Sequence, residues 1–112
     1  MNNYESGATS HAVNDLILWT ENTPELAQYR DDIFSIYRDA HPNTRFLMYG
    51  NLLKRAQWSY FQQFGLSESR HILPFGTESL AENMEGEFHP IQATEFCDLY
   101  ESDFEIWKSE NI

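Results

Sequence analysis

Cysteine and basic residues are both scarce in this sequence of 112 residues. The single cysteine, Cys97, excludes a disulfide within the chain and favours a reducing compartment. Seven Lys and Arg against 18 Asp and Glu give a formal net charge of −11. Because nucleic acids and anionic membranes are bound by clustered basic side chains, we expect no direct nucleic-acid binding and no membrane binding.

Long apolar runs and glycine-rich loops are also missing. No segment approaches the ~20 apolar residues that a membrane-spanning helix needs. The first ten residues lack the basic and apolar regions of a signal peptide, which predicts a cytoplasmic protein. The five glycines stand singly, so the chain contains neither GxGxxG nor a phosphate-binding loop.

The histidines and the single cysteine form no recognised catalytic or metal-binding pattern in the sequence. The histidines include no HxH or HxxxH pair, and Glu68-x-x-His71 is one copy of a motif that di-iron bundles use twice. Cys97 lies among carboxylates, which raise the pKa of a thiol and keep it unreactive. We therefore predict that the protein is not an enzyme and holds no metal and no cofactor.

Aromatic residues, by contrast, are abundant, with three Trp, six Tyr and eight Phe. A chain of this length that is 41% hydrophobic can bury a core without metals or disulfides. We predict a mainly α fold, a compact single-domain bundle of about four to five helices over residues 1–112. Residues 1–9 are expected to be a flexible lead-in, and residues 66–92 an irregular segment.

Capping residues and prolines locate the first two helices. Ser10 is suited to cap a helix over residues 11–21. Thr23-Pro24-Glu25 combines a hydroxyl cap, a proline at the first helical position and an acid near the positive end of the helix dipole. This pattern predicts a helix from Pro24 to about Ala40, which His41-Pro42 ends.

A third helix is expected to begin after a cap at Asn43 or Thr44 and to run to about Phe64, where Gly65 closes it. Its apolar residues cover more of the circumference than those of the other helices, so we expect it to be central.

Within the irregular segment, Ser67 is suited to cap one helical turn through Leu73, which Pro74 stops, and a short extended segment over residues 70–75 is the alternative. A short helix through Met84 is expected to follow.

The last predicted helix, over residues 94–110, combines an aromatic side with a row of carboxylates. Its apolar residues are Phe96, Leu99, Tyr100, Phe104, Ile106 and Trp107.

Asp103 falls within this apolar arc. It either finds a buried partner such as Arg30, or the helix breaks near Ser102, where Ser102-x-x-Glu105 has the form of a capping box.

Negative charge is concentrated in the second half of the chain, which carries ten acids and one base after Arg70. Carboxylates three or four apart on a helix stand ~5–6 Å from one another, comparable to successive phosphates of a nucleic-acid strand. We expect Asp98, Glu101 and Glu105 to face water as such a row. Glu25, Asp32 and Asp39 lie seven residues apart, along one edge of the predicted second helix. The full set of predicted partner-binding residues is Asp98, Glu101, Glu105, Glu95, Glu78, Glu82, Glu85, Asp32 and Asp39.

These observations support two hypotheses of function. The first is a small acidic inhibitor, a nucleic-acid mimic that blocks a protein with a basic surface, of the anti-defence or immunity type found in phages and plasmids. The second is a helical adaptor or homo-oligomeric scaffold that uses exposed rings such as Trp19, Trp58 and Trp107. Lys54 and Arg55 form the only basic cluster, and we expect them to pair with Asp31 or Glu68.

Overall fold

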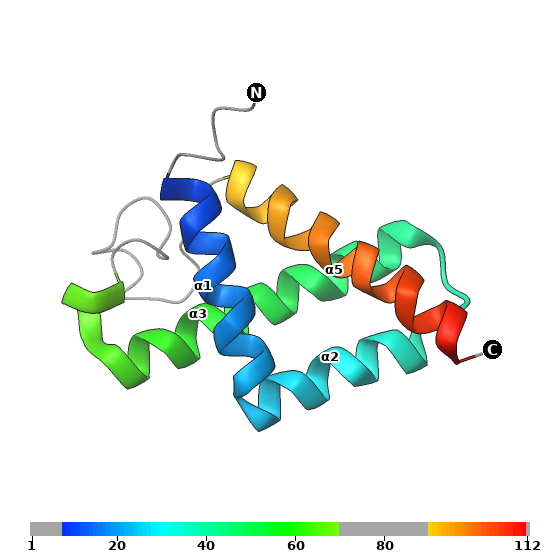
Figure 1. Ribbon diagram of the computed structural model, residues 1–112, viewed down its shortest axis with the longest axis horizontal. Coiled ribbons are helices and arrows are strands. Elements are labelled where there is room, and N and C mark those ends of the chain that lie inside the picture. The colour runs from blue at the N-terminus through cyan, green and yellow to red at the C-terminus, as the bar shows by residue number, and fades with distance from the viewer. Residues whose placement is uncertain (1–7, 70–89, 112) are drawn as a thin grey trace.

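The computed structural model describes residues 8–69 and 90–111, and every regular element within these two ranges is an α-helix. The helices are α1 (Ala8–Asn22), α2 (Pro24–Ile36), α3 (Pro42–Ser69) and α5 (Pro90–Glu110) (Figure 1). The prediction of a mainly α, compact bundle is confirmed. Residues 66–69 and 90–92 are helical rather than irregular, and the elements predicted between them lie outside the described residues.

The first two helices meet at Thr23. α1 begins at Ala8, so Ser10 lies inside its first turn and is not its cap. α2 begins at Pro24 as predicted, but the Thr23 hydroxyl does not cap it. That hydroxyl instead donates a hydrogen bond of 2.6 Å to the carbonyl of Trp19, in the last turn of α1. The Thr23 side chain therefore satisfies a carbonyl at the C-terminal end of α1 and does not cap the N-terminus of α2.

α2 ends at Ile36, four residues before the predicted end at Ala40. Arg45 stabilises the turn after this end, because its Nη1 donates to the carbonyl oxygens of Tyr37 at 3.2 Å and Ala40 at 2.8 Å. A guanidinium at this position satisfies carbonyls that a further helical turn would otherwise use. The turn that this arginine holds leads directly into α3.

His41, not Asn43 or Thr44, caps α3. The Nδ1 of His41 accepts a hydrogen bond of 3.1 Å from the backbone N–H of Asn43, and Pro42 takes the first helical position. Gly65 interrupts the helix as predicted, with φ 84° and ψ 174°, but helical conformation resumes and continues to Ser69.

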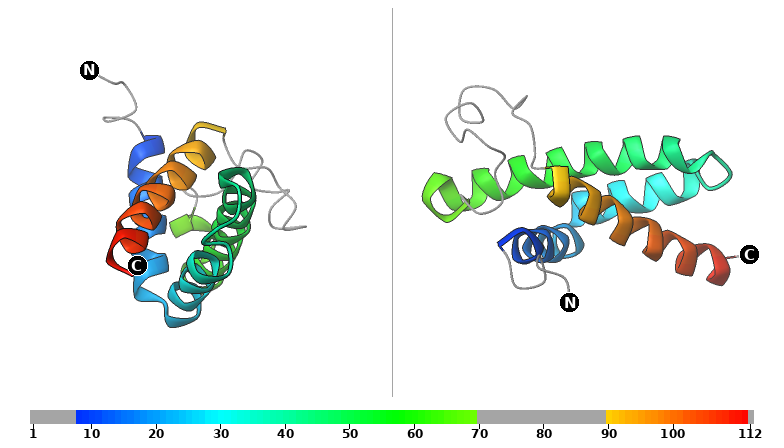
Figure 2. Two further views of the ribbon diagram at one scale, coloured as in Figure 1. Left: turned by 90° about the vertical axis from the view of Figure 1, so that its right-hand side faces the viewer. Right: turned by 90° about the horizontal axis from the view of Figure 1, so that it is seen from above.

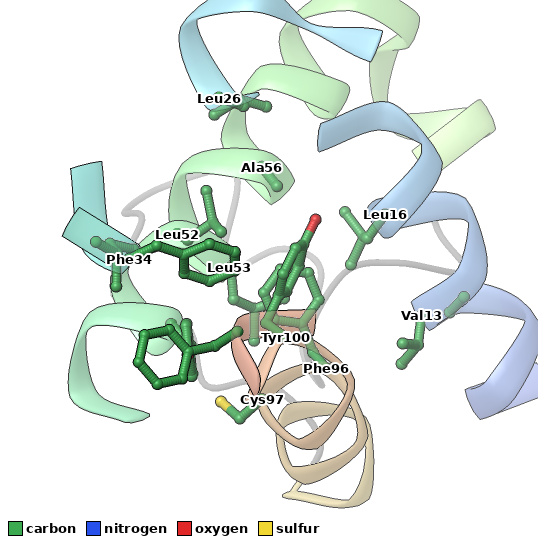
Figure 3. Packing of buried hydrophobic residues seen from close by; sticks show 14 residues of the cluster. Val13, Leu16, Leu26, Phe34, Leu52, Leu53, Ala56, Phe96, Cys97 and Tyr100 are labelled. Carbon is green, nitrogen blue, oxygen red and sulfur yellow. The ribbon is translucent and has the colours of Figure 1, made fainter. Parts of the chain in front are cut away.

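The core lies where α5 crosses α1 and α3, while α2 runs beside α3 (Figure 2). Rings and branched aliphatic side chains from all four helices meet there (Figure 3). Each of the four described helices contacts the other three, so these contacts do not single out α3 as the central helix that we expected. The largest side chains with almost no exposure are Tyr49, Tyr100, Phe96, Phe104, Leu16, Ile33 and Leu52.

Candidate functional site: the carboxylates of α5 and the adjoining helices

α5 is anchored by rings, as predicted, but its buried side is narrower than expected. Phe96, Tyr100 and Phe104 have no exposed surface, and Trp107 packs against Phe104 with ring centroids 6.0 Å apart. Leu99 and Ile106, which we placed on the same side, are 43% and 58% exposed. The helix is continuous from Pro90 to Glu110, so no break occurs near Ser102.

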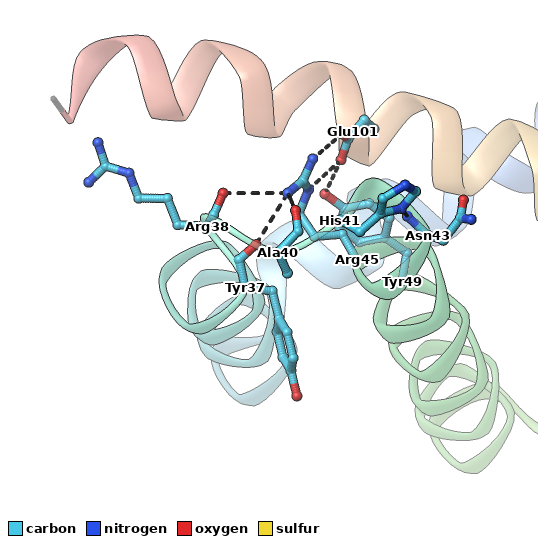
Figure 4. A network of polar contacts seen from close by, with 8 residues as sticks. All are labelled: Tyr37, Arg38, Ala40, His41, Asn43, Arg45, Tyr49 and Glu101. Carbon is cyan, nitrogen blue, oxygen red and sulfur yellow. Dashed lines mark hydrogen bonds and ion pairs between the residues drawn. The ribbon is translucent and has the colours of Figure 1, made fainter.

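Glu101 does not face water, contrary to our prediction. Its Oε1 and Oε2 accept hydrogen bonds from the Nε of Arg45 at 3.0 Å and from its Nη2 at 2.7 Å (Figure 4). The hydroxyl of Tyr49 adds a third hydrogen bond to Oε1 at 2.8 Å. The side chains of Arg45 and Glu101 are only 5% and 18% exposed. Position 101 lies at the edge of the apolar side of α5 that faces α3, and two α3 side chains reach it there.

This ion pair is a structural joint between three segments. Arg45 binds the turn after α2 through backbone carbonyls and α5 through Glu101, while the guanidinium carbon lies 4.0 Å from the ring centroid of Phe104. Burial opposes ionisation of Glu101, but the hydrogen bonds from Arg45 and Tyr49 outweigh it and lower the pKa of the carboxyl. Glu101 is therefore ionised, and its charge is already neutralised within the fold.

A second cluster of carboxylates gathers around Arg30, where α1, α2 and α5 approach one another. Arg30 forms ion pairs with Glu21 of α1 and with Asp31, the latter at 2.8 Å. The hydroxyl of Tyr100 donates to the other oxygen of Glu21 at 2.9 Å. Asp103 lies at the solvent-exposed edge of this cluster. Partial burial and the charge of Glu21 raise the pKa of Asp103, and Arg30 opposes them.

Asp103 thus resolves the two alternatives left by the sequence. The helix does not break, and the carboxyl stays near Arg30 at the surface instead of entering the core. Two carboxylates, those of Glu21 and Asp31, pair with the guanidinium of Arg30, and Asp103 is near enough for its pKa to be affected by that charge. Sequence reasoning missed Glu21, because the α1–α5 contact that brings it here leaves no periodic signal in the chain.

Asp98 and Glu105 remain as exposed carboxylates on α5. They are two helical turns apart, about 10 Å along the axis. Glu95 is half-buried, and burial raises the pKa of its carboxyl. Because Glu101 is paired with Arg45, the predicted row with a spacing of ~5–6 Å is reduced to two carboxylates at the wider interval.

The predicted acids of α2 are exposed but do not form one row. Glu25 and Asp32 lie on the helix, and Asp32 accepts a hydrogen bond of 2.9 Å from Gln28. Asp39 is exposed in the turn after α2. Because it lies outside the helix, it does not share a helical edge with Glu25 and Asp32. The predicted carboxylates Glu78, Glu82 and Glu85 lie outside the described residues.

The tryptophans proposed for an adaptor have different environments. The indole N–H of Trp19 donates to the hydroxyl of Ser59 at 3.0 Å, and Trp107 packs on the core. Trp58 is 37% exposed and lies against Phe61. The guanidinium of Arg55 lies over the ring of Tyr29 at 4.4 Å, where we had expected an acid as its partner.

Cys97 is buried, and burial together with the charge of Asp98 raises the pKa of its thiol to about 11. Across residues 8–69 and 90–111, no three His, Cys, Asp or Glu side chains are grouped as a metal site would require. Over the same ranges, no helix has the length and apolar character of a membrane-spanning segment. No protein-family model, curated protein or solved structure matches the chain.

Proposed function

We propose that the protein acts by binding, and that it inhibits a basic nucleic-acid-handling protein by occupying the surface where that protein binds phosphates. The observation that carries this proposal is the distribution of charge: exposed carboxylates on α5 project from a bundle with a ring-packed core, and the exposed acids of α1 and α2 add to the net negative charge. A net charge of −11 would draw a basic partner from solution and raise its rate of association.

The geometry supports mimicry of the charge of a nucleic acid rather than a copy of its phosphate spacing. Asp98 and Glu105 offer two carboxylates about 10 Å apart on one face of α5. Asp103 adds a further exposed carboxylate on α5, whereas Glu21 and Asp31 are already paired with Arg30. A groove lined with Lys and Arg can bind such an array, since those long side chains adapt to its spacing.

Reversal of the two exposed charges on α5 tests the proposal. The variant Asp98→Lys/Glu105→Lys keeps Glu101, whose substitution would break the joint to α3. The matched control is Glu25→Lys/Asp32→Lys, which changes the net charge equally on α2. Both variants are expected to remain folded, because all four side chains are exposed.

The measurement is affinity capture from a host lysate on the immobilised protein, with elution at increasing salt and identification by mass spectrometry. We expect a basic nucleic-acid-binding protein that elutes at moderate salt, competes with duplex DNA or RNA, and is lost from the α5 variant. If the α2 control variant captured equally little of this partner, net charge alone, and not the α5 face, would drive the binding. A complex that persists at high salt, or a partner that binds nucleic acid and this protein at the same time, would refute the proposed mimicry.

The alternative function, a helical adaptor or homo-oligomeric scaffold, is supported by apolar side chains left at the surface. Leu18 and Phe64, 60% and 43% exposed, line one groove with Trp19 and Tyr60 at the junction of α1 and α3. A partner bound there would be held by apolar burial, so its complex would survive moderate salt. Salt dependence therefore separates the two functions.

A further inference from the structure

Acidic residues are absent from one long stretch of this acidic chain. No Asp or Glu occurs between Asp39 and Glu68, an interval that contains nearly all of α3 and three of the basic residues, Arg45, Lys54 and Arg55. The only exposed acid of α3 is Glu68, next to its C-terminal residue, whereas α2 and α5 each carry several. The outer side of α3 is therefore the face at which another acidic molecule meets the least repulsion.

This outer side holds a groove of about 560 Å³ lined by Asn43, Phe46, Leu47, Gly50, Asn51 and Lys54. Leu47 projects from it with 72% of its surface exposed. One turn away, Gly50 leaves a notch, since a Cβ built at this glycine meets no atom within 4 Å. Leu47, Gly50 and Lys54 follow one another at intervals of three and four residues, so they share one face of the helix.

The packing among the described residues does not require a glycine at position 50. A glycine inside a helix is unfavourable relative to alanine, because it adds conformational freedom to the unfolded chain. Within residues 8–69 and 90–111, no atom comes within 4 Å of a Cβ built at this glycine, and its helical φ/ψ angles are open to any residue. The missing Cβ does, however, allow a side chain from outside to approach the helix backbone.

The projecting leucine and the notch are complementary to each other. If two α3 helices lie antiparallel with a two-fold axis passing between positions 48 and 49, Leu47 of each copy faces Gly50 of the other. The same axis places Lys54 opposite Asn43 of the second copy, whose side-chain carbonyl can accept a hydrogen bond from the ammonium. A two-fold interface needs this kind of self-complementary surface.

We infer that the acid-free outer face of α3 is a self-association site, at which two copies pack antiparallel with each Leu47 inserted over Gly50 of the other copy. This interface goes beyond the proposed inhibitory function, which uses the carboxylates of α5. Association through α3 joins two strongly negative molecules through the face that carries no acid. Higher salt screens their repulsion and strengthens the dimer, whereas it weakens binding of a basic partner.

Sedimentation equilibrium of the full chain from about 1 to 500 µM tests the inference, because one helix face buries little area and gives dissociation constants of about 10–100 µM. Leu47→Asp is expected to weaken the dimer by about 100-fold or more, since it places a charge in the notch. The matched control is Leu18→Asp, the same change at a leucine of similar exposure on α1, which should leave the dimer unchanged.

Gly50→Ala separates association from folding. The added methyl group meets no atom of the described residues, so the melting temperature of the dilute monomer should rise by about 3–6 °C. The same methyl group fills the notch and should weaken the dimer by about tenfold. This combination of a more stable fold with weaker association would not arise from misfolding.

Three outcomes overturn the inference. Wild-type protein that stays monomeric at the highest concentration and at 0.5 M salt has no such interface. A dimer that Leu18→Asp disrupts while Leu47→Asp does not uses another face. A dimer that keeps its full affinity in Gly50→Ala does not insert Leu47 over this glycine.

Discussion

Glu101→Gln provides a direct test of the joint between α5 and α3. The substitution keeps the size and shape of the side chain but removes its charge. Arg45, whose side chain is 5% exposed, then remains in the interior without a carboxylate. The amide of glutamine can accept only one of the two hydrogen bonds that the guanidinium donates to Glu101.

The expected cost follows from what remains around Arg45. Removing one partner of a fully buried ion pair costs about 3–5 kcal/mol. Here the guanidinium keeps the carbonyls of Tyr37 and Ala40 and the ring of Phe104, and the carboxylate is 18% exposed, so the pair is partly screened. We therefore expect a loss of about 2–3 kcal/mol, a large share of the ~5–15 kcal/mol that stabilises a typical domain.

Equilibrium unfolding in urea, followed by tryptophan fluorescence and circular dichroism, measures this loss. Glu105→Gln is the matched control on the same helix, since its side chain is exposed, and it should change stability by less than about 0.5 kcal/mol. A Glu101→Gln variant as stable as this control would refute the reasoning that the pair holds α5 to α3. A double-mutant cycle with Arg45→Met would then show no coupling.

The pH dependence of the same variant provides an independent check. The pKa of Glu101 is lowered in the folded protein, so the pair stabilises the fold fully above the ordinary value of 4.5 and loses this effect as the pH falls through the lower, folded pKa. The stability difference between wild type and Glu101→Gln should therefore shrink in acid. A difference that grows or stays constant below pH 4 would contradict the lowered pKa.

Three further substitutions test other parts of the structure. Gly65→Ala should cost about 1–3 kcal/mol in thermal unfolding, because φ 84° with ψ 174° is open essentially only to glycine; an unchanged melting temperature would show that the chain is not held in this conformation. Tyr100→Phe should cost about 1–2 kcal/mol in urea unfolding, since it removes the hydrogen bond to Glu21 while Arg30 still pairs with that carboxylate. Asp103→Asn should raise stability slightly at pH 7, because burial and Glu21 raise the pKa of Asp103 and so disfavour its charge, and the gain should vanish as the pH falls through that raised pKa. A loss of stability at pH 7 would show instead that Asp103 is stabilised by Arg30.

Local signals located much of the fold correctly. Pro24 marks the first position of α2, and Gly65 marks the interruption of α3. Proline and glycine act through their own backbone geometry, so their effect is visible without knowledge of the neighbours. His41 could also have been recognised, since it directly precedes Pro42 and its ring nitrogen is able to accept a hydrogen bond from the helix N-terminus.

The end of α2 and the environment of Glu101 could not be predicted in this way. Both involve Arg45, which lies 56 residues from Glu101 in the chain. The period of α5 places Glu101 only at the edge of the apolar side, where a carboxylate can face water or a neighbouring helix. The predicted row of acids is interrupted at Glu101, because this carboxylate pairs with Arg45 of α3 instead of facing water.

The amino-acid sequence by itself determined the helices, the ring-packed core and the excess of negative charge, because periodicity, the positions of proline and glycine, and composition act within a few residues of each position. Only the tertiary structure decided which charges remain available to a partner. Arg45 and Arg30 engage Glu101, Glu21 and Asp31, and leave Asp98 and Glu105 at the surface. Ion pairing depends on distances between helices, and those distances exist only after the helices have packed.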